Sequence, residues 1–200
     1  MTRTGIAGVI IAGGKGTRIG GGKPFLPFGG TTLIEAVIAR VQPQVDHLAL
    51  NLPKTAPRPA PHLPYLPDPL FADIGPLNGL LAGLNWLPQS CDWLASFPCD
   101  TPFLPRDLVA RLAAARSAER PVVVAAGEQI HALCALWPRA GFWSLRREVE
   151  AGRIRAMREA LALLDAVRLQ VPADDPAFFN VNTPEDLAEA DRLCRAGKTD

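Results

Sequence analysis

Six glycines and three cations lie close together near the start of the chain, a combination suited to holding phosphate groups. The glycines fall at positions 13–22, and the cations are Lys15, Arg18 and Lys23. Glycine lets backbone N–H groups close around an anion because no Cβ stands in the way, and the cations neutralise charge that amides alone leave. An apolar run over residues 6–11 precedes the glycines. We therefore predict a buried strand that leads into a phosphate-binding loop, with a solvated surface turn as the alternative.

The loop matches neither of the two best-known phosphate motifs. A dinucleotide fingerprint requires a third glycine where Ile19 stands, and the acidic residue expected after the second strand is missing. A P-loop requires glycine where Thr17 stands and serine or threonine where Pro24 stands. The sequence therefore indicates a phosphate loop of another type.

The elements that must position this loop alternate between strand and helix patterns. Strands are expected over residues 6–11, 47–50, 65–66, 93–97, 121–126, 131–137 and 167–171. Helices are expected over residues 33–41, 76–84, 105–112, 142–150, 154–164 and from 184 onward. This alternation predicts an α/β layer sandwich with a mostly parallel sheet. The proline-rich stretch 53–69 is interpreted as a stiff connection within one domain.

Three polar residues follow the expected strands. Asn51, Asp68 and Asp100 each stand where a strand ends, as the glycine loop does after the first strand. Ligands of open α/β sheets bind beyond the carboxyl ends of the strands, so we expect these groups at one edge. Mg²⁺ is usually held by one or two carboxylates together with substrate phosphates, so Asp100 can serve as its protein ligand. A helix cap before Pro102 is the alternative role for Asp100.

Other reactive side chains fit structural roles better. His131 starts an apolar strand without a second histidine or a cysteine at ligand spacing, so a zinc role is not supported. Cys99 has no lysine or histidine adjacent in sequence to lower its pKa, and core packing is the better interpretation. The four cysteines show no C-x-x-C spacing, which favours a reducing cytoplasm.

The overall composition excludes several classes of protein. A length of 200 residues suits one domain, and 48% hydrophobic with 20% charged residues is ordinary for a globular protein. With a net charge of +1, the chain lacks the excess of positive charge that is typical of a general nucleic-acid binder. The first apolar run is too short to cross a membrane. We therefore expect neither nucleic acid nor membrane as a partner.

With these residues assembled, the chain resembles the molybdenum cofactor guanylyltransferases of the nucleotidyltransferase superfamily. The matching segments run nearly end to end and are Ile11-Ala12-Gly13-Gly14 with Arg18, Gly20 and Lys23, then Asn51, Asp68, Gly75-Pro76-Leu77 with Gly79, Cys99-Asp100-Thr101-Pro102, and Asn180-Val181-Asn182-Thr183-Pro184-Glu185. The chain departs from the family pattern in the loop, where Gly22 stands in place of an acidic residue and Ile19 in place of methionine.

The resemblance implies a three-layer, Rossmann-like nucleotidyltransferase fold and transfer of GMP from GTP to the terminal phosphate of molybdopterin. It implies one domain over 1–200, with a nucleotide-binding part over about 1–105 and an acceptor-binding part over about 106–200. Molybdoenzymes or their chaperones are further possible partners.

The resemblance also implies roles for individual residues. Arg18, Lys23 and Asp100 would be catalytic, with Asp100 binding Mg²⁺. The remaining binding residues would be Ile11, Ala12, Gly13, Gly14, Asn51, Asp68, Gly75, Gly79, Asn180 and Asn182. Of these, Asn180 and Asn182 would face the pterin substrate or the reacting phosphates.

Two rival interpretations remain open at this point. The first is the same chemistry with another substrate, either a molybdopterin cytidylyltransferase or an enzyme that makes a nucleotide sugar. By likeness, the segment Asn180-Val181-Asn182-Thr183-Pro184 favours the guanylyl branch, since the cytidylyl relatives look more acidic there. The second is a protein that binds nucleotide or cofactor without catalysis.

Overall fold

The structure is a computed structural model, and it describes residues 5–12, 22–68 and 74–196. The predicted phosphate loop lies mostly outside these ranges, as do Gly13, Gly14 and Arg18 among the expected binding residues. No helix in the described ranges has the length and apolar character needed to span a lipid bilayer.

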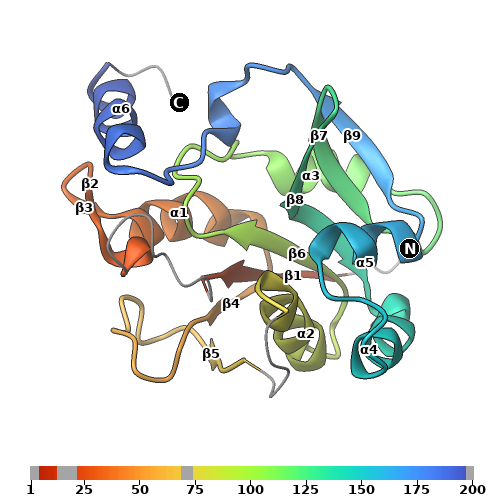
Figure 1. Cartoon of the computed structure of the whole chain (residues 1–200). Coiled ribbons are helices and arrows are strands. Elements are labelled where there is room, and N and C mark those ends of the chain that lie inside the picture. Colours follow the sequence, from red (N-terminus) through yellow and green to blue (C-terminus); the bar gives the residue numbers. More distant parts are fainter. Residues whose placement is uncertain (1–4, 13–21, 69–73, 197–200) are drawn as a thin grey trace.

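One twisted sheet forms the middle of the molecule (Figure 1). Its seven strands in the described ranges follow the order β5-β4-β1-β6-β8-β7-β9. The strands are β1 (Gly5–Ile11), β4 (His47–Asn51), β5 (Tyr65–Leu66), β6 (Cys91–Pro98), β7 (Val122–Ala126), β8 (Gln129–Pro138) and β9 (Val167–Val171). Only β8 runs antiparallel to its neighbours β6 and β7, and the other pairings within this sheet are parallel. The sheet is therefore mostly parallel, as predicted.

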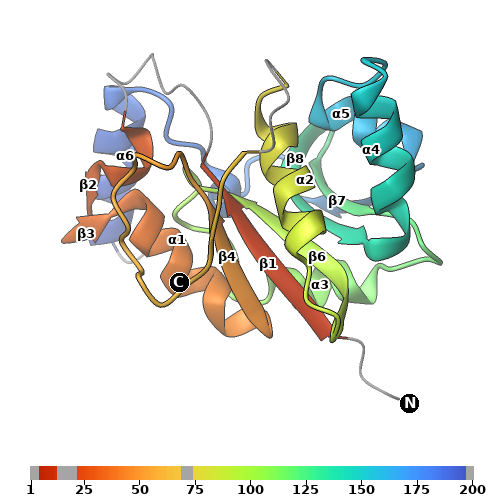
Figure 2. The same ribbon diagram turned by 90° about the horizontal axis from the view of Figure 1, so that it is seen from below.

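Helices cover both faces of the sheet and make three layers. They are α1 (Leu33–Val41), α2 (Pro76–Trp86), α3 (Leu108–Ala114), α4 (Phe142–Glu150), α5 (Met157–Leu163) and α6 (Pro184–Arg195). In Figure 2, α1 and α6 lie on one side of the strands, and α2, α4 and α5 lie on the other. The fold is the α/β sandwich that the strand and helix patterns predict.

The period of two along β1 divides the core between these layers. Ile10 packs with α1 and α3, whereas its neighbours Val9 and Ile11 pack with α2, α4 and α5. Successive side chains of a strand point to opposite faces, so a strand that is buried on both faces becomes an uninterrupted apolar run. This explains why residues 6–11 show no alternation of polar and apolar side chains.

The C-terminal segment returns to the N-terminal half of the chain. Val181 and Ala190 form a third buried cluster with Phe28, Leu33 and Phe103. Phe28 belongs to a short antiparallel hairpin, β2 (Pro27–Phe28) with β3 (Thr31–Thr32). As a result, the segment before α6 lies beside the residues that follow β1 and β6.

Some element boundaries differ from the sequence expectation. The hairpin β2–β3 was not predicted, since each of its strands has only two residues. The helix expected from Pro105 begins at Leu108, because the backbone N–H of Leu108 donates to Pro105 in a turn that precedes the helix. The helix expected from Ile154 begins at Met157. The N–H groups of Arg155 and Ala156, which precede the helix, donate to the side chain of Glu159 and cap its start.

Candidate active site

Lys23 and Asp100 meet at the carboxyl edge of the sheet. Lys23 Nζ lies 2.5 Å from Asp100 Oδ2 and 2.8 Å from Asn182 Oδ1. The side chains of Lys23 and Asp100 are only 14% and 20% exposed. A largely buried charge pair is screened less by solvent than a surface pair, so these two groups attract each other more strongly. The three residues come from the beginning, middle and end of the chain.

The backbone after β6 places the Asp100 carboxylate at this edge. Asp100 follows the last residue of β6 by two positions, and its carbonyl accepts the N–H of Val181 at 2.9 Å. The hydroxyl of Thr101 donates to Asn180 Oδ1 at 2.5 Å. These two bonds tie the turn after β6 to residues 180–182, so the C-terminal segment forms one wall of the site.

The start of α6 holds Asn182 in place. Thr183 caps the helix with its side chain, and Pro184 occupies the first helical position. Asp186 Oδ2 accepts the N–H groups of Asn182 and Thr183, both at 2.9 Å. This capping box satisfies free N–H groups at the helix start, and it fixes the backbone of Asn182 as a consequence. The cap predicted from the sequence is confirmed.

A second polar pair lies on the other side of β1. Asn51 Nδ2 donates to Asp68 Oδ1 at 2.8 Å and to the carbonyl of Leu66 at 3.1 Å. Asn51 is fully buried at the end of β4, whereas Asp68 is exposed just after β5. Asn51 therefore orients a carboxylate that remains accessible to a ligand.

Two of the predicted binding residues, Gly79 and Ala12, are in close contact with Asn51. A Cβ at Gly79 would lie 2.4 Å from Asn51 Oδ1, so only glycine lets α2 approach the strand so closely. The N–H of Ala12 donates to the carbonyl of Asn51 at 3.0 Å. The N–H of Ala12 is thus already used within the fold.

The oxygen atoms around Lys23 also suit a hard divalent cation. Asp100 Oδ2 and Asn182 Oδ1 converge on the ammonium group, and both are oxygen donors of the kind that Mg²⁺ prefers. In the described part of the chain, no group of three or more His, Cys, Asp or Glu side chains could hold a metal. Asp100 and Asn182 are thus the residues beside Lys23 whose oxygen atoms could hold such an ion.

The thiol beside Asp100 is not an available nucleophile. Cys99 is buried, and burial together with the negative charge of Asp100 raises its pKa to about 12. The thiolate is the reactive form of cysteine, so Cys99 stays protonated at neutral pH. The role in core packing that the sequence favoured agrees with this environment.

A profile for the MobA-like NTP transferase domain matches residues 8–167 of the chain. The chain belongs to this family. It is 43% identical over 195 residues to a molybdenum cofactor guanylyltransferase of Rhodopseudomonas palustris (strain BisB5), with 92% of each chain covered. It is 42% identical over 191 residues to a molybdenum cofactor guanylyltransferase of Cereibacter sphaeroides, covering 94% of this chain and 96% of the relative.

Solved structures of MobA-like and related proteins share the fold. Molybdopterin-guanine dinucleotide biosynthesis protein A from Archaeoglobus fulgidus superposes with a TM-score of 0.78 at 23% identity, over 96% of this chain and 99% of that one. The 2-C-methyl-D-erythritol 4-phosphate cytidylyltransferase from Thermus thermophilus gives 0.72 at 19% identity, over 98% and 100%. These likenesses establish the Rossmann-like nucleotidyltransferase fold.

In this MobA-like chain the expected residues form two groups. Lys23, Asp100, Asn180 and Asn182 meet on one side of the edge, and Ile11, Ala12, Asn51, Asp68 and Gly79 gather on the other. Gly75 lines a cavity together with Asp100. The functional roles of these residues stay predictions.

The position of Thr101 in the site was not predicted from the sequence. Its hydroxyl links Asp100 to the opposite wall through Asn180, yet threonine next to an aspartate gives no distinctive signal in one sequence. The place of Thr101 inside the Cys99-Asp100-Thr101-Pro102 segment was the only available hint.

Proposed function

We propose that the chain transfers the GMP part of GTP to the terminal phosphate of molybdopterin and releases pyrophosphate. The family membership and the relatives at 40–43% identity support this activity. An oxygen of the acceptor phosphate attacks the α-phosphorus of GTP, and the bond from this phosphorus to the bridging β-oxygen breaks. The product is a dinucleotide that contains guanine.

The observation that carries the proposal is the pairing of Lys23 with Asp100 beside Asn182 at the carboxyl edge. The ammonium group would bind the triphosphate, because charge-assisted hydrogen bonds to phosphate are among the strongest in proteins. Arg18 and the loop glycines Gly13 and Gly14 would complete the phosphate site. Asp100, with Asn182 near it, would hold Mg²⁺, which supplies charge neutralisation when it is bound.

The residues beyond β1 would bind the nucleoside. Asp68 presents a carboxylate that can accept hydrogen bonds from the base, and Asn51 orients it. The carbonyl groups of Ile11 and Ala12 lie at the end of the neighbouring strand. We assign this side to GTP, and with it the nucleotide-binding role of the N-terminal part of the chain.

The reaction does not require a strong general base. A phosphate monoester is already anionic at neutral pH, so catalysis depends on alignment and on neutralising charge at the α-phosphate. The protonated thiol of Cys99 agrees with such chemistry. The free thiols are also consistent with a cytoplasmic location, and delivery of the product to molybdoenzymes would follow the reaction.

The test is pyrophosphate release from GTP or CTP by purified protein with molybdopterin and Mg²⁺. We expect release with GTP, dependent on molybdopterin and abolished by chelation of the metal. The variant Asp100→Ala should lose at least about a hundredfold in rate, since it removes the charge at the reacting phosphate. As a control, Asp92→Ala removes a carboxylate that is 56% exposed on the surface and should keep the wild-type rate.

Each rival function predicts a different result. A preference for CTP would identify a cytidylyltransferase and overturn the choice of base. Binding of GTP without any release of pyrophosphate, with or without Mg²⁺, would identify a protein that binds nucleotide without catalysis.

A further inference from the structure

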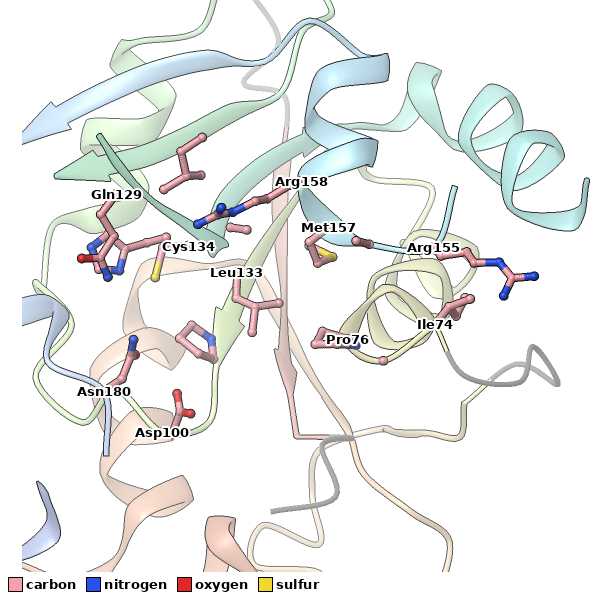
Figure 3. Close-up of a pocket in the computed structure, with 16 residues that line it drawn as sticks. Ile74, Pro76, Asp100, Gln129, Leu133, Cys134, Arg155, Met157, Arg158 and Asn180 are labelled. Atoms are coloured by element: carbon pink, nitrogen blue, oxygen red, sulfur yellow. The ribbon is translucent and has the colours of Figure 1, made fainter. Parts of the chain in front are cut away.

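A cavity of about 540 Å³ opens beside Asp100 (Figure 3). Its apolar wall comes from three elements, with Pro76 from α2, Leu133 from β8 and Met157 from α5. Asp100 and Asn180 line it at the end nearest the proposed reaction centre. The proposed function assigns no residue to the far end of this cavity.

A bulge in β8 borders the cavity. Val123 of β7 pairs with Ala135, but the next residue, Val124, pairs with His131, so three residues of β8 have no partner on β7. The ladder between β6 and β8 also stops at Ser96 opposite Ala135. The backbone pairing of β6 with β8 therefore ends before the carboxyl end of β6. Bulges re-aim side chains next to functional sites, and this one places Leu133 on the cavity wall.

The order of strands divides the carboxyl edge into two sides. β4 and β5, with Asn51 and Asp68, lie on one side of β1, whereas β6 and then β8 lie on the other. Asp100 follows β6 and stands between the two sides. A nucleotide bound across β1 would place its α-phosphate near Asp100 and leave the cavity next to β8 for the second substrate.

Two arginine side chains line the cavity away from Asp100 and Asn180 (Figure 3). Arg155 and Arg158 both line it. Within the described part of the chain, neither guanidinium group forms a hydrogen bond or an ion pair with another side chain. In Figure 3 the side chain of Arg158 extends over the cavity toward Gln129, while that of Arg155 extends past Ile74. Asp100, the carboxylate in the lining, is already neutralised by Lys23.

Neutral polar groups stand near Arg158. Gln129 and His131 line the same end of the cavity. The ring of His131 packs against Phe178, with 5.1 Å between ring centroids and 37° between the planes. An amide and an imidazole can each donate and accept hydrogen bonds, which suits the edges of a heterocycle.

We propose that this cavity binds the end of the acceptor that is remote from its phosphate, and that Arg158 determines the affinity for that end. The ligand would be a polar ring system that presents hydrogen-bond acceptors at its far side, joined to a phosphate that reaches Asp100. The pterin ring of molybdopterin has this chemistry, so the inference rests on the proposed function and adds the residues that recognise its second substrate.

The test compares Arg158→Gln with a matched control. Arg168 is also exposed, lies on β9 and does not line the cavity, so Arg168→Gln removes the same charge elsewhere. Fluorescence titration of the protein with molybdopterin, without nucleotide, measures acceptor binding, and titration with GTP serves as the second readout. A thermal unfolding curve verifies that each variant folds.

We expect Arg158→Gln to raise the Kd and the KM for molybdopterin about tenfold or more, as the loss of one charged hydrogen bond predicts. The Kd for GTP should stay within about twofold, and Arg158→Lys should recover part of the acceptor affinity. Equal acceptor affinity in Arg158→Gln and Arg168→Gln would overturn the assignment while leaving the activity intact. Loss of GTP affinity in Arg158→Gln would also overturn it, since the cavity would then belong to the nucleotide. A wild-type protein that never transfers GMP would refute the proposed function instead.

Discussion

At the scale of single residues, the site is organised by a lysine that connects two acceptor groups. Lys23 contacts Asp100 and Asn182, which are separated from it by 77 and 159 positions in the sequence. Triphosphate oxygens carry more negative charge than this carboxylate and amide together. Binding of the nucleotide is therefore expected to draw the ammonium group away from Asp100 and leave the carboxylate free for a metal ion.

We predict that Lys23→Ala weakens binding of GTP by about 10- to 100-fold, since hydrogen bonds to charged groups are worth about 1.5–3 kcal/mol. Isothermal titration with GTP measures the change. The surface variant Lys54→Ala, also in the described part of the chain, serves as the control because Lys54 lies in the connection after β4. An unchanged affinity in Lys23→Ala would contradict the assigned role.

His131 should make stability depend on pH. Burial lowers its pKa, and the charge of Asp175 acts in the opposite direction. An unfolded histidine has a pKa of about 6.5, so below that value the unfolded chain binds more protons than the folded one. The contribution of His131 is therefore favourable above about pH 6.5, and it is lost as the pH falls toward the folded pKa.

Urea unfolding at about pH 7.5 and about pH 5.5 tests this expectation, because the two values lie on either side of the unfolded pKa. As the pH is lowered from the first value to the second, the free energy of unfolding should fall less in His131→Gln than in the wild type. An identical fall in both proteins would show that His131 does not contribute.

At the scale of elements, α2 touches β1, β4 and β6 through glycines. Gly79 faces Asn51 and Ile11, and Gly83 faces Leu94 and Val9, where an added Cβ would lie 2.9 Å from each of the last two. Both positions are too crowded for a side chain. Only a side chain at position 79 would crowd a residue of the proposed nucleotide site, which is Asn51.

We predict that Gly79→Ala and Gly83→Ala both lower the free energy of unfolding, by about 1–3 kcal/mol, because added volume in a packed core forces backbone shifts. Only Gly79→Ala should also raise the Kd for GTP, because it displaces Asn51 and through it Asp68. Equal affinity for GTP in the two variants would argue against a role of the Asn51–Asp68 pair in binding.

Much of this level of structure could be predicted from the sequence. The uninterrupted apolar run of β1, the valines of β7 and the cap at Thr183 all gave correct elements, because these signals act over a few residues. The hairpin β2–β3 and the bulge in β8 were not predicted. Both depend on contacts between segments, and no local pattern of residues marks them.

At the scale of the whole molecule, the meeting of Asp100 with Lys23 was predicted because parallel strands end at one edge of a sheet. The cavity beside Asp100 was not predicted from the sequence. Arg158 lies on a helix that packs over β8, and nothing in its own neighbourhood in the sequence indicates that this helix borders the site. In the proposed division, the nucleotide part and the acceptor part of the chain lie on the two sides of one continuous sheet.

The packing of the whole chain also sets the reactivity of its thiols. Cys91, Cys99 and Cys134 are buried, and burial raises the pKa of each, whereas Cys194 is exposed. We predict that a disulfide reagent modifies one of the four cysteines rapidly in the folded protein and all four after denaturation. The variant Cys194→Ser should lose the rapid phase. Rapid modification of a second thiol would contradict the buried environments.

We propose that GTP lies across β1 with its phosphates at Lys23 and Asp100. A crystal structure of the protein with a non-hydrolysable GTP analogue and Mg²⁺ tests it most directly. We predict phosphate oxygens in contact with Lys23, a metal ion bound to Asp100, and guanine beside Asn51 and Asp68, with the cavity next to β8 free of nucleotide. Guanine in that cavity, or a triphosphate that does not contact Lys23, would contradict the account.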